Sequence, residues 1–151
     1  MASENPDVLH TFVPNEDLRT NQYHLVEIIC WSDRWNGPLV GLCGDGEKMC
    51  GVLQNAPNLP GADPGEWAIV MRVGKSKAVI GAAIACARSW ASDAHGHVVG
   101  AVANDWIGGQ MHEPGTLSPT PTGGEIATVD VEALNPWKAD HAWVDFVGGV
   151  Q

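Results

Sequence analysis

The sequence has few basic residues. It contains 8 Lys and Arg residues against 18 Asp and Glu residues, and its formal net charge is −10. Because an acidic surface repels phosphate backbones, we expect no nucleic acid among the partners of this chain. Arg72, Lys75 and Lys77 stand close together, but the adjacent glycine and serine indicate a solvated turn between strands rather than a binding patch.

Long apolar runs are also missing. No segment of the sequence is long enough to cross a membrane. The stretch from Met1 to Pro14 has neither the basic start nor the continuous apolar stretch of a secretory signal. We therefore expect a chain that is made in a cytoplasm and has no membrane partner.

The cysteines do not form a recognisable framework. There are four, Cys30, Cys43, Cys50 and Cys86, and none belongs to a Cys-x-x-Cys pair. In a reducing cytoplasm, buried thiols are the expected state. Cys43 and Cys50 flank a Gly-Asp-Gly turn and could face each other across two strands, so a disulfide formed after lysis is the alternative.

Familiar catalytic and cofactor-binding signatures are absent. There is no Gly-x-Ser-x-Gly turn and no glycine fingerprint of a dinucleotide site. The triplet Gly74-Lys75-Ser76 resembles the end of a phosphate-binding loop, but Ile69 stands where that loop requires a glycine. His112-Glu113 cannot open a zinc-binding His-Glu-x-x-His helix, because Pro114 follows.

One set of residues could approach a metal. Asp93, His95 and His97 would share a face if they lay on a strand, and three such ligands could converge on zinc. The segment Ser92–Gly96 has turn chemistry, however, and nothing marks a fourth ligand. We therefore predict no catalytic residues, no cofactor-binding residues and no metal site, and the chain is not expected to be an enzyme.

The sequence does contain a pattern that occurs twice. Residues 48–73 and residues 105–131 each read as a strand, a proline-containing loop and a second strand that starts with Gly-Glu. The matched positions are Gly51 with Gly108, Pro57 with Pro114, and Gly65-Glu66 with Gly124-Glu125. The two glutamates are interpreted as strand starts rather than as catalytic carboxylates. With 18 glycines and 10 prolines, the repeat predicts a mainly β protein, a small β domain of two similar strand–loop–strand halves.

Three segments are expected along the chain. Residues 1–22 lack a hydrophobic period and are predicted to be an extended N-terminal arm, either frayed or ordered on a partner. Residues 23–134 form the β domain, with at most one short helix in the alanine-rich stretch 78–90. Residues 135–151 form a tail that packs on the domain or on a neighbouring subunit. The tail aromatics are Trp137, Trp143 and Phe146, and the expected strands include 23–31, 49–54, 66–73 and 97–102.

Tryptophan dominates the aromatic residues, with seven tryptophans against one tyrosine and two phenylalanines. Packing in a core or at a subunit interface is the expected role. Stacking on sugars is the alternative. It leaves open a second function, a trimeric module that presents tryptophans to glycans on a host surface.

Parts of the repeat match the motifs of a known family. Cys50–Pro57 contains the pattern Gly-Val-x-Gln-Asn-x-Pro, and Gly65–Gly74 contains Gly-Glu-x-Ala-x-Val followed by a glycine. Ile84–Val99 reads as an apolar run followed by Ser-Asp-x-x-Gly, and Ile107–Val129 supplies two closing strands. These features resemble the core signature of the small capsid decoration, or cement, proteins of tailed bacteriophages.

The resemblance covers residues 40–132 and implies a compact β-barrel-like or β-sandwich-like domain, commonly a homotrimer, with no reaction and no cofactor. It implies that the chain binds major capsid proteins on the outer surface of the mature icosahedral head, where they meet, and stabilises the shell. At Ala87-Arg88 the chain departs from the family pattern of a glycine and a polar residue, so the resemblance does not imply the geometry of that link.

Overall fold

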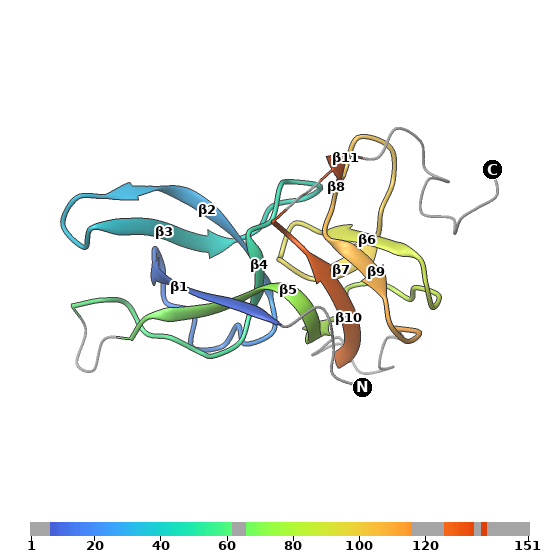
Figure 1. Cartoon of the computed structure of the whole chain (residues 1–151), viewed down its shortest axis with the longest axis horizontal. Helices are drawn as coiled ribbons and strands as arrows, with labels where there is room; N and C mark the ends of the chain where they lie inside the picture. Colours follow the sequence, from blue (N-terminus) through green and yellow to red (C-terminus); the bar gives the residue numbers. More distant parts are fainter. Residues whose placement is uncertain (1–6, 62–65, 116–125, 135–136, 139–151) are drawn as a thin grey trace.

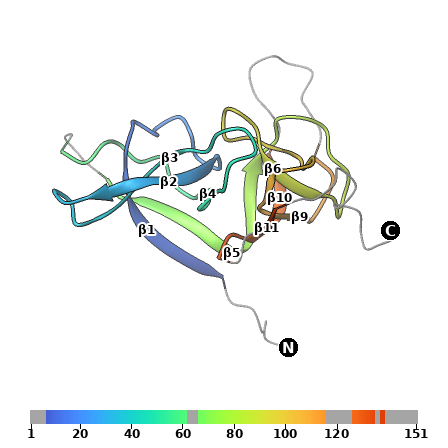
Figure 2. The same cartoon turned by 90° about the horizontal axis from the view of Figure 1, so that it is seen from above.

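The structure is a computed structural model that describes residues 7–61, 66–115, 126–134 and 137–138. These residues form eleven strands and no helix, so the mainly β prediction is confirmed. The strands are β1 (Val8–Pro14), β2 (Leu25–Ser32), β3 (Gly37–Leu42), β4 (Gly51–Leu53), β5 (Ala68–Val79), β6 (Ser89–Ser92), β7 (Val98–Gly100), β8 (Trp106–Ile107), β9 (Gly109–Met111), β10 (Ile126–Glu132) and β11 (Trp137–Lys138). β1–β4 lie on one side of the molecule and β6–β11 on the other, with β5 running between them (Figures 1 and 2).

The first five strands form a small closed barrel. Their order is β1-β3-β2-β4-β5, and β1 also pairs with β5, which closes the ring. β1 runs parallel to β3, and the other neighbours are antiparallel. The buried residues that form its core are Phe12, Leu18, Val26, Val40, Cys50, Leu53, Ala68 and Val70. We call this unit the first barrel.

The N-terminal segment is part of the first barrel, so the expectation of an arm over residues 1–22 is corrected. Val8–Pro14 forms β1, whose residue Phe12 is buried, and Leu18 is fully buried. The apolar residues of this segment show no single period in the sequence because they belong to two kinds of local structure. Phe12 lies on a strand and Leu18 in the turn that follows, yet both side chains pack into the same core. Residues 1–6 lie outside the described residues.

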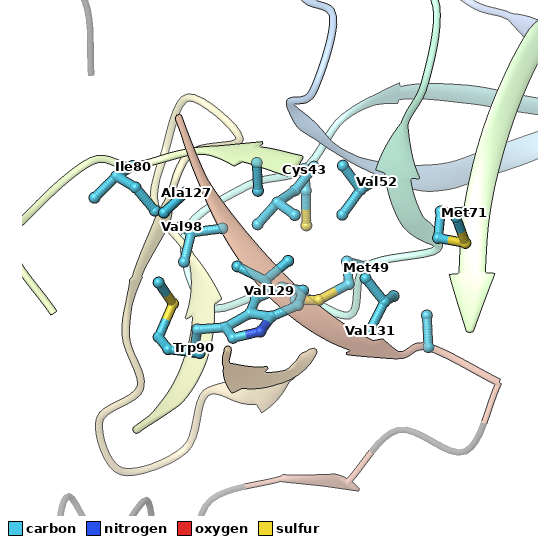
Figure 3. Packing of buried hydrophobic residues seen from close by; sticks show 14 of the residues in the cluster. Cys43, Met49, Val52, Met71, Ile80, Trp90, Val98, Ala127, Val129 and Val131 are labelled. Carbon is cyan, nitrogen blue, oxygen red and sulfur yellow. The ribbon is translucent and has the colours of Figure 1, made fainter. Parts of the chain in front are cut away.

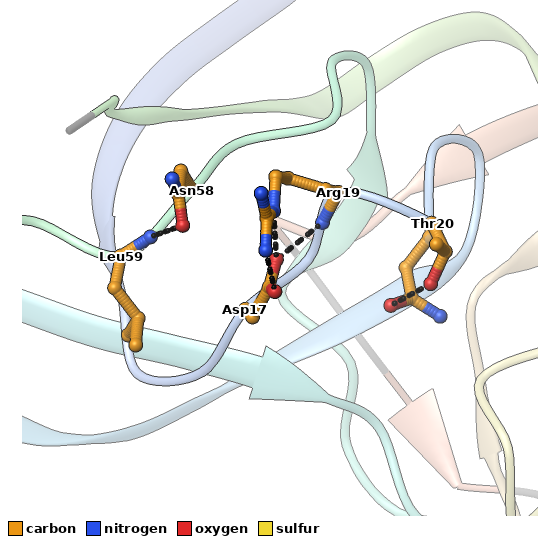
Figure 4. A network of polar contacts seen from close by, with 6 residues as sticks. Asp17, Arg19, Thr20, Asn58 and Leu59 are labelled. Carbon is orange, nitrogen blue, oxygen red and sulfur yellow. Dashed lines mark hydrogen bonds and ion pairs between the residues drawn. The ribbon is translucent and has the colours of Figure 1, made fainter. Parts of the chain in front are cut away.

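The turn after β1 is fixed by a polar network (Figure 4). Nε and Nη2 of Arg19 donate hydrogen bonds to the Asp17 carboxylate at 2.9 and 2.7 Å. These bonds from Arg19 lower the pKa of Asp17 to about 2. Leu18 stands between Asp17 and Arg19 in the sequence, and its N–H donates a hydrogen bond to the carbonyl of Pro57 at 3.1 Å. The turn therefore exposes its charges while Leu18 fills the barrel.

β5 belongs to both parts of the molecule. Its first half pairs with β1 and β4, and residues 73–79 pair with β10. The expected turn at Gly74–Lys77 is therefore wrong, because β10 gives these residues a strand partner. No helix forms in the stretch 78–90 either. Ala78 and Ile80 are buried in the core, and tertiary pairing overrides the helix propensity of the alanines.

Four of the remaining strands, β6, β7, β9 and β10, repeat the pairing of the first barrel, whereas β8 and β11 form a separate two-stranded sheet. The order β3-β2-β4-β5 corresponds to β7-β6-β9-β10. The register agrees as well. Val26↔Leu42, Glu27↔Gly41 and Ile28↔Val40 correspond to Trp90↔Gly100, Ala91↔Val99 and Ser92↔Val98. We call the second part of β5 together with β6–β11 the second half, and the prediction of two similar halves is confirmed.

The second part of β5 has the role in the second half that β1 has in the first barrel. Pro14 at the end of β1 lies parallel to Val40. Ile80, directly after β5, forms the equivalent parallel bridge to Val98. One long strand therefore ends the first barrel and begins the second half.

Side chains confirm the equivalence of the two strand–loop–strand units. Asn55 Oδ1 accepts a hydrogen bond from the N–H of Ile69 at 3.0 Å. Glu113 Oε1 accepts one from the N–H of Thr128 at 2.8 Å. In each unit, the side chain that follows the first strand satisfies a backbone donor of the second, which fixes where the loop returns.

The matched glycines differ by one position from the sequence prediction. Gly51 has φ 156° and Gly109 has φ 153°. A Cβ on Gly51 would overlap the carbonyl oxygen of Met71, and one on Gly109 would overlap that of Asp130. Gly51 therefore corresponds to Gly109 and not to Gly108. The adjacent glycines at 108 and 109 hid this shift in the sequence.

A second core lies between the first barrel and the sheet of the second half (Figure 3). Trp90 is fully buried at its centre, beside Met49 and Val129 in Figure 3. Its Nε1 donates to the carbonyl of Asp130 at 3.2 Å, so its polar atom is satisfied. Residues of both halves contribute to this core, which joins them.

Of the predicted tail at residues 135–151, the structure describes only β11. It pairs antiparallel with β8, through Trp137↔Ile107 and Lys138↔Trp106. Trp143 and Phe146 lie outside the described residues.

Candidate functional site

The residues considered for metal binding form a turn. Asp93 Oδ1 accepts hydrogen bonds from the backbone N–H groups of His95 and His97, at 2.8 and 2.9 Å. The three residues therefore do not share one face of a strand. In the described part of the chain, no group of three or more His, Cys, Asp or Glu residues could hold a metal ion.

One of these histidines instead meets a histidine of the first barrel. Nε2 of His97 lies 3.2 Å from Nε2 of His24, and Nδ1 of His97 lies 3.3 Å from Asp93 Oδ2. Burial lowers the pKa of His24, and the nearby His97 lowers it further. The N–H of Leu25 donates to the carbonyl of Gly96 at 2.7 Å, so the pair lies where the two halves touch.

The clustered basic residues lie on β5 and have partners within the fold. Nε of Arg72 donates to the carbonyl of Cys50 at 3.0 Å, and its guanidinium lies 5.7 Å from the centre of the Phe12 ring. Lys75 and Lys77 are both exposed on one face of β5, where Lys75 stands opposite Asp130 of β10 in the strand register. The carboxylate of Asp130 offsets part of this positive charge.

Among the residues that the structure describes, no helix has the length and apolar character needed to cross a membrane.

All four cysteines are free thiols. Burial raises the pKa of Cys43 to about 12 and that of Cys50 to about 11, so both stay protonated near neutral pH. They serve as core residues on either side of the Gly-Asp-Gly turn. Cys30 and Cys86 are exposed.

Two hollows on the surface have linings of mixed charge. One, of about 360 Å³, includes Glu27, Glu47, Lys48 and Arg72. Burial raises the pKa of Glu27, and the negative charge of Glu47 adds to the effect. The other hollow runs along β5 and β10. Cys50 also lines the first hollow, but burial raises the pKa of its thiol to about 11, so the thiol is not an activated nucleophile near neutral pH.

The tryptophans divide between core and surface. Trp90 is a core residue, as expected for this residue type. Trp31 and Trp67 are 58% and 52% exposed. Trp31 belongs to a continuous exposed apolar run on the outer part of β2, which also includes Ile28, Ile29 and Cys30.

This exposed run is the feature that sequence reasoning missed. The strand over 23–31 was predicted, but its outer part was not recognised as surface. The available signal was the unbroken apolar sequence Ile28–Trp31, since a strand with one solvated face normally alternates.

The outer part of β2 also has an open edge. β2 pairs with β4 only at Leu25 and Val26, whereas it pairs with β3 along its length. Beyond Val26, the described structure therefore leaves one edge of β2 without a neighbouring strand.

No family model and no curated protein matches the sequence. Among solved structures, the chain is similar to the N base of the head fiber gp8.5 of bacteriophage phi29, with a TM-score of 0.61 and 13% sequence identity. The match covers 90% of this chain and 100% of that chain. At this identity the likeness establishes a shared fold. Because it spans 90% of this chain, the shared fold includes both halves.

Proposed function

We propose that this chain is a non-enzymatic structural protein of a phage virion. More specifically, it is a decoration protein that binds major capsid proteins on the outer surface of the head and stabilises the shell. The observation that carries the proposal is the fold that it shares, over both halves, with a base protein of a phage head fiber. The motif resemblance of residues 40–132 to decoration proteins supports it from the sequence.

The physical properties of the chain suit this role. A closed barrel joined to a second half through β5 is a rigid block, and its net charge of −10 keeps separate copies soluble before they meet a shell. A homotrimer would contact the shell at several points, and multivalency strengthens attachment without requiring a strong single contact.

Purified virions test the proposal. We expect the chain to co-purify with heads, and heads that lack it to release DNA at a lower temperature. Adding the purified chain back should restore the original release temperature. If add-back leaves that temperature unchanged, the chain does not stabilise the shell.

The matched structure favours a second candidate, the base of a projecting head fiber. Electron microscopy of heads with and without the chain separates the two. A decoration protein adds density across the lattice, whereas a fiber base is required for projections to appear. Loss of projections with unchanged shell stability would favour the fiber base.

A further inference from the structure

The two halves differ at the hairpin between β2 and β3. In the first barrel, residues 29–39 connect the matched pair Ile28↔Val40. In the second half, residues 93–97 connect the equivalent pair Ser92↔Val98. Eleven residues therefore stand where five close the same hairpin. We call residues 29–39 the hairpin extension.

The second half closes its hairpin without an extension. In the first barrel, Leu39 is the residue of the extension that pairs with β1, opposite Val13. The β2 residues of the extension are poorly buried. Ile29 is 47% exposed and Trp31 is 58% exposed. Cys30 and Trp31 point to opposite faces of the strand, and both are exposed, so neither face is covered.

An open apolar strand edge can pair with the edge of another chain, so in a protein that acts as a monomer it promotes aggregation. Natural sheets protect such edges with charged residues, proline or a covering segment. The segment Ile28–Trp31 contains no charge, and β2 has no described neighbour on its second edge there. Such a surface is typical of one that another protein covers.

The distribution of charge favours a second copy of this chain as that protein. The extension carries one acidic residue, Asp33, and one basic residue, Arg34, so its formal charge is zero. The whole chain carries −10. Two copies repel each other wherever their acidic surfaces approach, and this repulsion is weakest where the extensions meet.

We propose that the hairpin extension is the self-association surface of this chain, and that the open edges of β2 from neighbouring copies contact one another. The inference rests on the proposed function in one respect, because the assembly that it builds is the homotrimer of the decoration protein.

Light scattering on the purified full chain, with no capsid present, tests the surface. We expect the wild-type chain to have the mass of three copies and Ile29→Lys to have the mass of one. Ile126→Lys is the matched control, because Ile126 is 50% exposed but lies in the second half. It should keep the mass of three copies.

A second variant tests the same surface without introducing a lysine, whose charge could disturb the local structure of β2. Residues 29–39 are replaced by the sequence of residues 93–97, which closes the equivalent hairpin. We expect this variant to keep the far-UV circular dichroism spectrum of a folded chain and to be monomeric. A monomeric wild-type chain, or a trimer that survives both changes, would overturn the proposal.

Cys30 provides an independent readout. In a Cys86→Ser chain, Cys30 is the remaining exposed thiol, since Cys43 and Cys50 are buried. A short thiol cross-linker should give covalent dimers, and the added change Cys30→Ser should abolish them. Absence of dimers from the Cys86→Ser chain would contradict contact between the β2 edges.

The same variants separate this inference from the proposed function. If the chain is trimeric but does not bind heads, the self-association surface stands and the decoration role fails. If the wild-type chain is monomeric and loses head binding when the extension is replaced, the extension contacts the capsid and the self-association proposal is wrong.

Discussion

Gly51 and Gly109 show at the residue scale how the two halves are built alike. Each has a φ near +155° and lies against a carbonyl of the following strand. Any side chain there would combine backbone strain with a steric clash. We expect Gly109→Ala to lower the free energy of unfolding by about 2–4 kcal/mol, as measured by urea denaturation.

Gly100 in β7 is the control for this prediction. A Cβ at Gly100 would meet only ordinary contacts, 3.8 Å from Ile84 and Arg88 side-chain atoms. Gly100→Ala should therefore change the free energy of unfolding by less than about 0.5 kcal/mol. Equal effects of the two substitutions would show that Gly109 has no special constraint.

The His24–His97 pair gives the fold a pH dependence. Burial and His97 lower the pKa of His24 in the folded state, so the unfolded chain binds protons more readily than the folded chain. The contribution of His24 is present above its unfolded pKa of about 6.5 and is lost as the pH falls below that value. His95 and Asp93 are the other titratable groups at this contact: the ring centre of His95 lies 5.9 Å from that of His97, and Asp93 Oδ2 lies 3.3 Å from Nδ1 of His97.

We expect urea denaturation to give a lower free energy of unfolding at pH 5.5 than at pH 7.5. In His24→Gln this difference should shrink, because the group that resists protonation is gone. His10 is exposed on β1, and His10→Gln serves as the control that retains the wild-type difference. An unchanged pH difference in His24→Gln would assign it to other groups.

At the scale of elements, β5 determines how the molecule unfolds. It is a strand of the first barrel and of the second half, and the core around Trp90 draws residues from both. We expect the described fold to unfold as one cooperative unit. Tryptophan fluorescence and far-UV circular dichroism should give the same urea midpoint, and the amides of β4 and β9 should exchange with similar free energies. Separate midpoints would mean that the halves are independent.

The elements also show what the sequence could and could not predict. The repeat was recognisable because turns, prolines and strand starts are local signals. The continuation of β5 through Gly74–Lys77 was not, because its partner β10 lies some fifty residues further along the chain. β1 was missed for the same reason, since its pairing with β5 is a long-range contact. The open edge of β2 could not be predicted either. It depends on how far β4 extends beside β2, and this long-range pairing leaves no local pattern in the sequence.

At the scale of the whole molecule, the chain has the features of a structural subunit. Two similar halves share one strand, and within the described residues the buried side-chain polar atoms have hydrogen-bond partners. Three exposed apolar side chains, Ile28, Ile29 and Trp31, stand close together on the outer part of β2. In the described part of the chain, potential metal ligands are not brought together into a site. Under the proposed function, the molecule acts by being held in place on a larger assembly.

The proposed decoration role is tested by binding of the purified chain to phage heads that lack it. Heads are incubated with increasing amounts of the chain and sedimented, and the bound copies are counted per head. We expect saturable binding, with a fixed number of copies per head set by the symmetry of the capsid lattice. Electron microscopy of these heads should show added protein density on the outer surface. Binding no greater than that of an unrelated acidic protein would contradict the account.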